Sequence, residues 1–454
     1  MGATGVVIQQ GNSAVTNFLF DNKVTWSPGS TFVFRDYTGG PAVSGRNYAM
    51  NVVFDSSGSA VNVGSINGTG TWTIQGDFTI GENVNFQFGT FTGTLDYQKS
   101  VIVGGTLGTT ANAARSFTIN SGRELLMQNA GTLNIASDQT VTISGSVRST
   151  ASAAQTSTIA GGSLSLGGGN RTFDVTAGTG NALLEIASVI ADGGQTPGGL
   201  TKTGAGTLRL TSINTFTGPT SIEAGTLQFG AEASLASTLI IVKSQAFLDA
   251  KAKANETLQL NGGQTLQSGG TIDGNLVVAN GATLAPGNST GTTTTTGTTT
   301  LGPGGRFQFE INNPTLTGTA GSTTSGWDLL VTGALTITAT VENPHVIDIV
   351  SLTAGQEPGE LNGFNPAEPY EWRFVTASQE TQNFNASVFS INTTNFFPND
   401  WAAPGRGFSV GLATGDNTSL AIFYTPEPEA WLLAGLGLTA TGWMARRRKA
   451  TRNA

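Results

Sequence analysis

The segment Thr71–Phe88, TWTIQGDFTIGENVNFQF, contains the pattern from which the fold is predicted. Apolar and polar residues alternate in it with a period of two, and Gly76 and Gly81 interrupt the alternation. A period of two is the spacing of side chains on one face of a β-strand, and the runs are too short for helices. The residues predicted to face inward are Trp72, Ile74, Phe78, Ile80, Val84, Phe86 and Phe88. We therefore predict short strands separated by glycine corners.

The same pattern recurs along most of the chain, for example in SFTIN (Ser116–Asn120) and GTLNIASDQTVTISG (Gly131–Gly145). Each unit is a short strand followed by a corner of Gly, Asn, Ser or Asp, about every 8–12 residues. Even spacing over hundreds of residues favours a solenoid, in which each coil buries its inward residues against its neighbours. We predict an all-β chain with a right-handed parallel β-helix over residues 1–327. An array of β-sandwiches is the alternative, but it predicts longer strands and visible domain boundaries.

Composition narrows the classes of function. The chain has 454 residues, of which 38% are hydrophobic and 11% charged, so an extended core can form. A formal net charge of −8 gives no electrostatic basis for binding the phosphates of nucleic acid. The absence of cysteine excludes disulfides, thiolate zinc ligands and a cysteine nucleophile, and it suits an exported bacterial protein. We expect no nucleic-acid partner and no cofactor.

One segment has a more specific signature. Gly198–Gly230 reads GGLTKTGAGTLRLTSINTFTGPTSIEAGTLQFG, and it resembles the autotransporter-associated β-strand repeat of passenger domains in secreted bacterial β-helices. The matching elements are GGLTKTGAGTL, NTFTGPTSI and EAGTLQ. We expect one inward column formed by Leu200, Leu208, Leu210, Phe216, Ile222 and Leu227, and corners at Gly204, Gly206, Gly218 and Gly225.

After residue 327 the chain becomes richer in aromatic residues. Residues 328–425 are predicted to form the last coils and a β-rich cap, because the end of a solenoid must cover its exposed core and strand edges. The alternative is a carbohydrate-binding β-sandwich that would use an exposed Trp372 or Trp401. Buried tryptophans in strands are commoner than ligand platforms, so the cap is preferred.

The C-terminal segment differs from everything before it. An uncharged, mostly apolar run from Ala430 to Ala445 is followed at once by a basic cluster. Such a run can span a bilayer as a helix, and the positive-inside rule places the basic cluster in the cytoplasm. The predicted transmembrane residues include Ala430, Trp431, Leu432, Leu433, Leu436, Leu438, Trp443 and Met444, and the cluster is Arg446, Arg447, Arg448 and Lys449. A buried amphipathic helix is the alternative.

Residues 426–449 resemble the PEP-CTERM sorting signal, with residues 450–454 as a short tail. The resemblance rests on the order of three parts: the motif Pro426, Glu427, Pro428, then the apolar run, then the basic cluster. It implies recognition by an exosortase, a membrane-embedded cysteine protease and transpeptidase. It also implies an inner-membrane-anchored precursor that is passed to the cell surface or extracellular matrix. Members normally begin with a secretory leader, whereas Met1–Phe20 has neither a basic n-region nor an apolar h-region.

The chain offers few candidates for catalysis. Its single histidine, His345, has no partner at metal-ligand spacing, and no nucleophile-elbow motif supports a catalytic triad. Two carboxylates would suffice for a polysaccharide lyase or glycosidase. The candidates are Glu357, Glu360, Glu368 and Glu371, in a Pro- and Gly-rich loop where solvated surface is the preferred interpretation. We predict no catalytic residue and no metal site.

These observations favour an exported structural or adhesive β-solenoid at the cell surface or in the extracellular matrix. The expected partners are the exosortase, the membrane through the C-terminal helix, and either exopolysaccharide or surface proteins. The alternative is a surface polysaccharide-active enzyme on the same scaffold. If the chain is such an enzyme, we expect an acidic cleft with two carboxyl groups within about 5–10 Å of each other. If it is a scaffold, we expect a polar groove without that pair.

Overall fold

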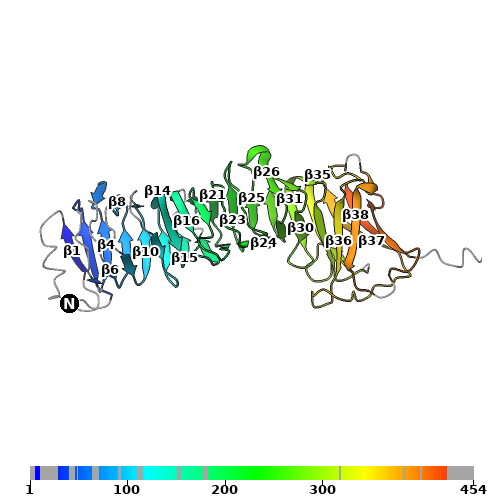
Figure 1. Ribbon diagram of the computed structural model, residues 1–454, viewed down its shortest axis with the longest axis horizontal. Coiled ribbons are helices and arrows are strands. Elements are labelled where there is room, and N and C mark those ends of the chain that lie inside the picture. The colour runs from blue at the N-terminus through cyan, green and yellow to red at the C-terminus, as the bar shows by residue number, and fades with distance from the viewer. Residues whose placement is uncertain are drawn as a thin grey trace, which may run out of the picture.

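The computed structural model describes residues 6–10, 29–39, 47–48, 50–63, 71–89, 94–109, 116–150, 155–176, 183–315, 318–381, 384–398 and 401–426. These residues form an elongated stack of short strands that progresses from β1 at one end to β37 and β38 at the other (Figure 1). The strands of successive coils pair in parallel over nearly the whole length. The prediction of an all-β chain with parallel strands in long sheets is confirmed, and the pairings are those expected of a parallel β-helix. Right-handed winding stays a prediction.

Each regular coil supplies a strand to each of three sheets in turn. The first sheet has one strand per coil from end to end. It contains β1 (Val6–Gln10), β2 (Thr31–Arg35), β4 (Asn51–Asp55), β7 (Phe78–Ile80), β10 (Ser100–Val103), β13 (Glu124–Met127), β15 (Ser146–Ser149), β17 (Arg171–Val175), β20 (Leu200–Thr203), β22 (Thr220–Ile222), β24 (Leu239–Val242), β27 (Thr265–Ser268), β30 (Thr283–Pro286), β32 (Arg306–Ile311), β36 (His345–Ser351) and β38 (Phe389–Asn395). At about 4.8 Å per coil, this sheet is roughly 70 Å long.

In most coils a strand of the second sheet, and then one of the third, follows the strand of the first sheet. The second contains β5 (Val61–Val63), β8 (Val84–Gln87), β11 (Thr106–Gly108), β18 (Leu183–Ile186), β21 (Thr207–Leu210), β23 (Thr226–Phe229), β25 (Phe247–Asp249), β28 (Thr271–Asp273) and β37 (Tyr370–Ala377). The third side of the coils begins with a separate three-stranded sheet of β3 (Asn47–Tyr48), β6 (Thr71–Ile74) and β9 (Thr94–Tyr97), and continues with β12 (Ser116–Ile119), β19 (Val189–Ala191), β26 (Thr257–Leu260) and β29 (Asn275–Val278); we call all of these the third sheet. Four long strands belong to both sheets: β14 (Thr132–Ile143), β16 (Thr156–Ser165), β31 (Thr292–Leu301) and β35 (Leu329–Ile337).

The long strands connect the second and third sheets by bending at a corner. In β14 the pairing with β16 shifts register between Ile135 and Thr140, so the first part of the strand lies in one sheet and the last part in the other. β31 and β35 have the same kind of shift after Thr295. These long strands therefore join the second and third sheets into one continuous set of pairings.

The core consists of columns of inward residues in register from coil to coil. On the second sheet, one column contains Phe86, Leu107, Leu133, Ile159, Ile186 and Leu210, and each of these side chains is buried. Complete burial of such a side chain contributes about 1.5–3 kcal/mol. Because most of that surface is covered by the neighbouring coils, a single coil has little stability of its own.

The six apolar residues predicted to stack inside the repeat are all fully buried. They do not form a single column, however. Leu208 pairs with Leu227 on the second sheet, whereas Leu200 and Ile222 lie on the first. The single column is therefore wrong, because the residues between these short strands turn the chain from one sheet to the next. The predicted corners at Gly204 and Gly225 have positive φ angles of 74° and 66°.

The third sheet is interrupted at the repeat. Between β19 and β26 it is reduced to one isolated bridge, Ile213 to Ser234. The buried side chain of Asn214 fills the gap: its Oδ1 accepts a hydrogen bond from Ile190 N (3.0 Å), and its Nδ2 donates to Ser212 O (2.8 Å) and Ser234 O (3.1 Å). One carboxamide thus replaces the backbone groups that a missing strand would have supplied.

The direction of the strands reverses near the C-terminal end. β37 continues the parallel second sheet through β35, and then pairs antiparallel with β40 (Ser419–Thr425). β39 (Gly407–Leu412) pairs antiparallel with the other edge of β40. Beneath them, Phe364, Tyr370, Trp372, Phe408 and Tyr424 pack with ring centroids 5.0–6.5 Å apart. Trp372 is 1% exposed, so it is a core residue of the predicted cap and not an exposed ligand platform.

Replacing Asn214 by Ala is expected to destabilise the coils on either side of it. The change removes three hydrogen bonds and leaves the buried N–H group of Ile190 without an acceptor, at a cost of about 1–3 kcal/mol. Denaturant midpoints and hydrogen exchange at the Ile190 amide would measure the effect. The exposed neighbour Thr215→Ala is the control, and equal midpoints for the two variants would show that the carboxamide does not hold the coils together.

Candidate functional site

The outward face of the second sheet has a continuous polar ladder, in which each coil places one polar side chain in register with the next. Its members are Asn62, Asn85, Thr106, Thr132, Thr158, Glu185, Arg209, Gln228, Asp249 and Asp273. Two pairs of successive members are hydrogen-bonded to each other: Asn85 Nδ2 donates to Asn62 Oδ1 (2.9 Å), and Gln228 Nε2 donates to Asp249 Oδ2 (2.7 Å). The ladder is uncharged toward the N-terminal end and charged from Glu185 onward.

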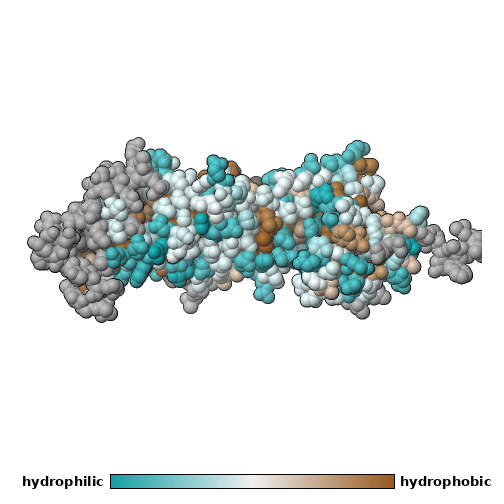
Figure 2. Space-filling model, turned by 60° about the horizontal axis from the view of Figure 1, so that its bottom comes forward, coloured by the Kyte–Doolittle hydropathy of each residue, from teal (hydrophilic) through white to brown (hydrophobic). Residues whose placement is uncertain are grey.

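The charged end of the ladder is held by local bonds. Asp273 accepts hydrogen bonds from Lys251 Nζ and Thr296 Oγ1, both at 2.8 Å. Burial alone would raise the pKa of Asp273, but these bonds hold it below its ordinary value. Large apolar side chains exposed in the described part of the chain, such as Ile213 and Phe247, are scattered, and Figure 2 shows a mostly polar surface with separate apolar spots. The described surface is therefore hydrophilic along the rod.

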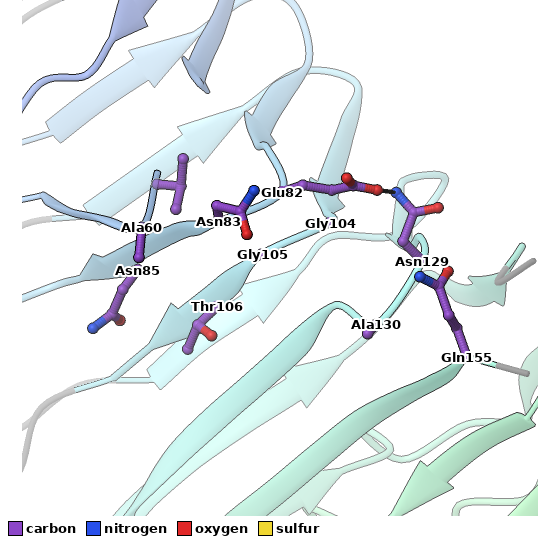
Figure 3. Close-up of a pocket in the computed structure, with 11 residues that line it drawn as sticks. Ala60, Glu82, Asn83, Asn85, Gly104, Gly105, Thr106, Asn129, Ala130 and Gln155 are labelled. Carbon is purple, nitrogen blue, oxygen red and sulfur yellow. Dashed lines mark hydrogen bonds between the residues drawn. The ribbon is translucent and has the colours of Figure 1, made fainter. Parts of the chain in front are cut away.

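A recess, which we call the corner notch, lies where the polar ladder meets the corner between the first and second sheets (Figure 3). It is a cavity of about 410 Å³ with polar side chains from Glu82, Asn83, Asn85, Thr106, Asn129 and Gln155. The notch exists because successive corners differ in length. The corner from β10 to β11 is only Gly104–Gly105, whereas the corners of the coils before and after it are longer.

The glycine corner is fixed by close backbone contacts. A Cβ on Gly105 would lie 2.3 Å from Gly81 O and 2.4 Å from Val84 O, so no other residue fits there. The adjoining corners turn through Asn83 and Asn129, whose φ angles are 60° and 51°. Asparagine tolerates this left-handed conformation better than most residues. Asn129 Nδ2 donates a hydrogen bond to Glu82 Oε1 across the short corner (Figure 3).

A second cavity, of about 240 Å³, lies beside β26 and has a different character. Its lining includes the apolar side chains of Phe229, Ala233, Leu235, Ile240 and Leu258. Lys253 lies with its Nζ 5.7 Å from the centre of the Phe229 ring and donates a hydrogen bond to Ala233 O. Burial lowers the pKa of Lys253, although the charge of Glu232 opposes the shift. Lys253 is therefore part of the cavity wall, and its ammonium group is already hydrogen-bonded to the protein.

Lys202 is a buried cation inside the repeat. It occupies an inward column between Phe173 and Ile222, and its side chain is 0% exposed. Its Nζ donates to Thr203 O (2.7 Å), Gly204 O (2.7 Å) and Ala224 O (3.1 Å), and thus supports the corners of two successive coils. Burial lowers its pKa to about 8, with Asp174 opposing. At neutral pH the ammonium group is retained, and its three hydrogens match the three carbonyls.

The sequence favours a structural role for His345, and the surroundings of its imidazole agree with that role. His345 begins β36, with Nδ1 2.9 Å from Gly302 O and a buried Nε2 that has no partner among the described residues. Burial lowers its pKa to about 4, so the imidazole is neutral at pH 7. The neighbouring Arg306 and Asp348 are paired with each other. No serine or cysteine is hydrogen-bonded to the imidazole in the described part of the chain.

The four candidate carboxylates are exposed, as the preferred interpretation expected. Glu371 accepts hydrogen bonds from Thr414 N (2.8 Å) and Oγ1 (2.7 Å), and Glu368 accepts one from Asn365 Nδ2 (3.1 Å). Glu368 is thus held within its own loop, whereas Glu371 lies in β37 and is bonded to the turn between β39 and β40. Among the described residues that line the corner notch, Glu82 is the one carboxylate, so they do not supply the pair that glycoside cleavage uses.

A buried acid pair escaped the sequence prediction. Asp328, at the beginning of β35, is fully buried and accepts hydrogen bonds from Gly291 N (2.9 Å) and Glu310 N (2.8 Å). Burial, together with the charge of Glu310, raises its pKa well above the ordinary value. Burial also raises the pKa of Glu310. The sequence indicates this buried pair only weakly, because a single Asp next to Trp327 is equally typical of a corner between strands.

The predicted sorting residues lie almost entirely beyond the described part of the chain. Pro426 directly follows β40, and it is the last described residue. Glu427, Pro428, the apolar run and the basic cluster lie outside the described residues, so their roles stay predictions. Within the described ranges the helices are two 3-10 turns, Ala254–Glu256 and Ala386–Val388, and no helix there is long enough to cross a membrane.

Comparison with known proteins supports the repeat. The family model of the passenger-associated-transport-repeat matches residues 200–229, in agreement with the predicted repeat at 198–230. A search of curated proteins finds none that matches the chain. Repeats of this kind belong to exported surface passengers, so this part of the chain is similar to a surface β-solenoid of the passenger type.

Replacing Lys202 by Met is expected to weaken the repeat. Methionine suits the apolar column but leaves three buried carbonyls without a donor, which should cost a few kcal/mol. Hydrogen exchange of the amides between Thr203 and Ala224 would detect the local loss. Lys251→Met, at a 55% exposed side chain, is the control, and it should change the protection of these amides little, because an exposed ion pair contributes little to stability. Equal protection in the two variants would show that Lys202 is dispensable.

The His345→Asn variant is expected to change the acid stability of the protein. The folded pKa of about 4 lies below the ordinary 6.5, so the unfolded chain binds more protons between these pH values. The wild type should therefore lose up to about 3 kcal/mol relative to the variant as the pH falls from 6.5 to 4. Asn can keep the hydrogen bond to Gly302 without titrating. Parallel stability curves for the two proteins over this range would contradict the assignment.

Proposed function

We propose that the chain is an exported, surface-displayed structural and adhesive β-solenoid, sorted by an exosortase through its C-terminal signal. The observation that carries the proposal is the stack of parallel coils, continuous along the first sheet, with the passenger-type repeat in its middle. Such a rod presents a long, stiff, polar surface, and the polar ladder follows it over successive coils. This is the form of a scaffold that holds binding groups away from a membrane.

The C-terminal order of elements supports the sorting part of the proposal. The described strands end with β40 at Thr425, whose side chain is exposed, and the sequence continues as the Pro-Glu-Pro motif, an apolar run and a basic cluster. A proline on each side of Glu427 disfavours helix, which suits presentation to a protease outside the membrane. Processing there would convert an inner-membrane-anchored precursor into a form at the cell surface or in the extracellular matrix.

Sorting can be tested by expressing the chain behind a secretory leader in hosts with and without an exosortase. We expect a full-length, membrane-bound protein without the enzyme, and a protein shortened by the C-terminal signal and released from the inner membrane with it. Mass spectrometry and membrane fractionation measure the two changes. Replacing Arg446, Arg447 and Arg448 by Ala should weaken retention of the precursor, because the cytoplasmic charges oppose its translocation.

Two single variants separate recognition of the motif from a general effect of charge. Glu427→Ala should reduce processing in the host with the exosortase, whereas Glu357→Ala, at an exposed loop position, should not. An identical mass and location in both hosts would refute the sorting signal. The surface scaffold would then need another route of export.

A further inference from the structure

We propose that the corner notch binds consecutive sugar units of a neutral polysaccharide lying along the solenoid axis. This inference rests on the adhesive part of the proposed function and assigns it a place and a class of ligand. Sorting through the C-terminal signal is a separate property, so the two can fail independently. The supporting observations are the shape of the notch, the chemistry of its lining, and its continuity with the polar ladder.

The shape of the notch is set by backbone and not by mobile side chains. Its lining comes from five successive corners, those that contain Ala60, Glu82, Gly104, Asn129 and Gln155. At about 4.8 Å per coil these corners cover roughly 19 Å along the axis, a length suited to a few sugar units. The middle of the recess lies over Gly104–Gly105, where the close contacts of Gly105 fix the short corner.

The lining excludes several classes of ligand. The described residues that form it include no Lys or Arg, so they offer nothing to neutralise a phosphate, a sulfate or an acidic sugar, and Glu82 would repel each of them. A calcium ion takes six to eight oxygen ligands with several carboxylates, whereas these residues supply one. Their largest apolar side chain is that of Val84, which is buried. An apolar ligand would gain little there.

The lining suits hydroxyl groups. A carboxamide both donates and accepts, as a hydroxyl does, and carboxamides supply most of the polar side chains of the notch. The carboxylate of Glu82 adds an acceptor and is positioned by Asn129. The side chains of Asn83 and Thr106 make no hydrogen bond to the residues that the structure describes, so both can bind a ligand without breaking an internal bond.

The polar ladder extends the site beyond the notch. Asn85 and Thr106 belong to both, and Thr106 is in register with Thr132, which in turn is in register with Thr158. A chain molecule that occupies the notch therefore meets a further polar side chain at every coil. This periodicity favours a polymer with hydroxyls at regular spacing over an isolated small molecule.

Calorimetric titration of the full chain tests the proposal. The probes are linear hexasaccharides of glucose, mannose and galactose, with hexagalacturonate as the acidic comparison. We expect at least one neutral probe to bind, and hexagalacturonate to bind at least about tenfold more weakly. The double variant Asn83→Gly and Thr106→Val should lower the affinity about tenfold, since two hydrogen-bonding side chains are lost. Glycine accepts the positive φ of position 83, and valine keeps the branched shape of threonine.

Two further variants make the result specific to the notch. Thr226→Val changes an outward threonine of the same sheet in the repeat and should leave the affinity unchanged. Glu82→Gln should reduce the discrimination against hexagalacturonate by removing the repelling charge. Binding of no neutral probe, an unchanged affinity in the folded double variant, or equal binding of the acidic probe would each overturn the proposal. If the ligand proposal failed in this way but exosortase processing were normal, the proposed function as a surface scaffold would be retained and only this ligand would be excluded.

Discussion

The structure depends on the stacking of each coil on its neighbours in strict register. Parallel strands satisfy their backbone groups only through the next coil, and inward side chains are covered mainly by residues one coil away. The column from Phe86 to Leu210 illustrates the constraint, because a shift of one residue in any coil would turn its apolar side chains to water. Short strands suffice because this stacking continues along the rod.

Buried polar residues also favour the native register of the coils over shifted alignments. Lys202 and Asn214 lie in the repeat, where the third sheet is interrupted, and each bonds to more than one coil. A slipped alignment would leave their donors and acceptors unpaired in a dry interior, which costs more than a misplaced methyl group. The repeat thus replaces regular pairing by a few specific bonds.

Period-two alternation predicted the strands well. Thr71–Phe88 contains β6, β7 and β8, and six of its seven predicted inward residues are 0–2% exposed, with Phe88 at 5%. The burial of Lys202 was not predicted, although its position two residues after Leu200 places it on the inward side. A lysine is rarely buried, so its residue type indicates an exposed position even where the alternation indicates an inward one. The corner notch could not be predicted, because it arises from the relative lengths of corners in coils whose register the sequence alone does not specify.

The place at which the chain leaves the described structure has a mechanical consequence. β40 is the middle strand of three, bonded to β37 on one side and β39 on the other, and Pro426 follows it directly. Tension applied through the C-terminal segment would load both rows of hydrogen bonds in shear, so that many bonds share the force at once. A terminal edge strand would instead peel away bond by bond. If the proposed sorting signal holds the rod by this segment, drag from flowing fluid would act on bonds that share the load, and the fold would resist unravelling from its point of attachment.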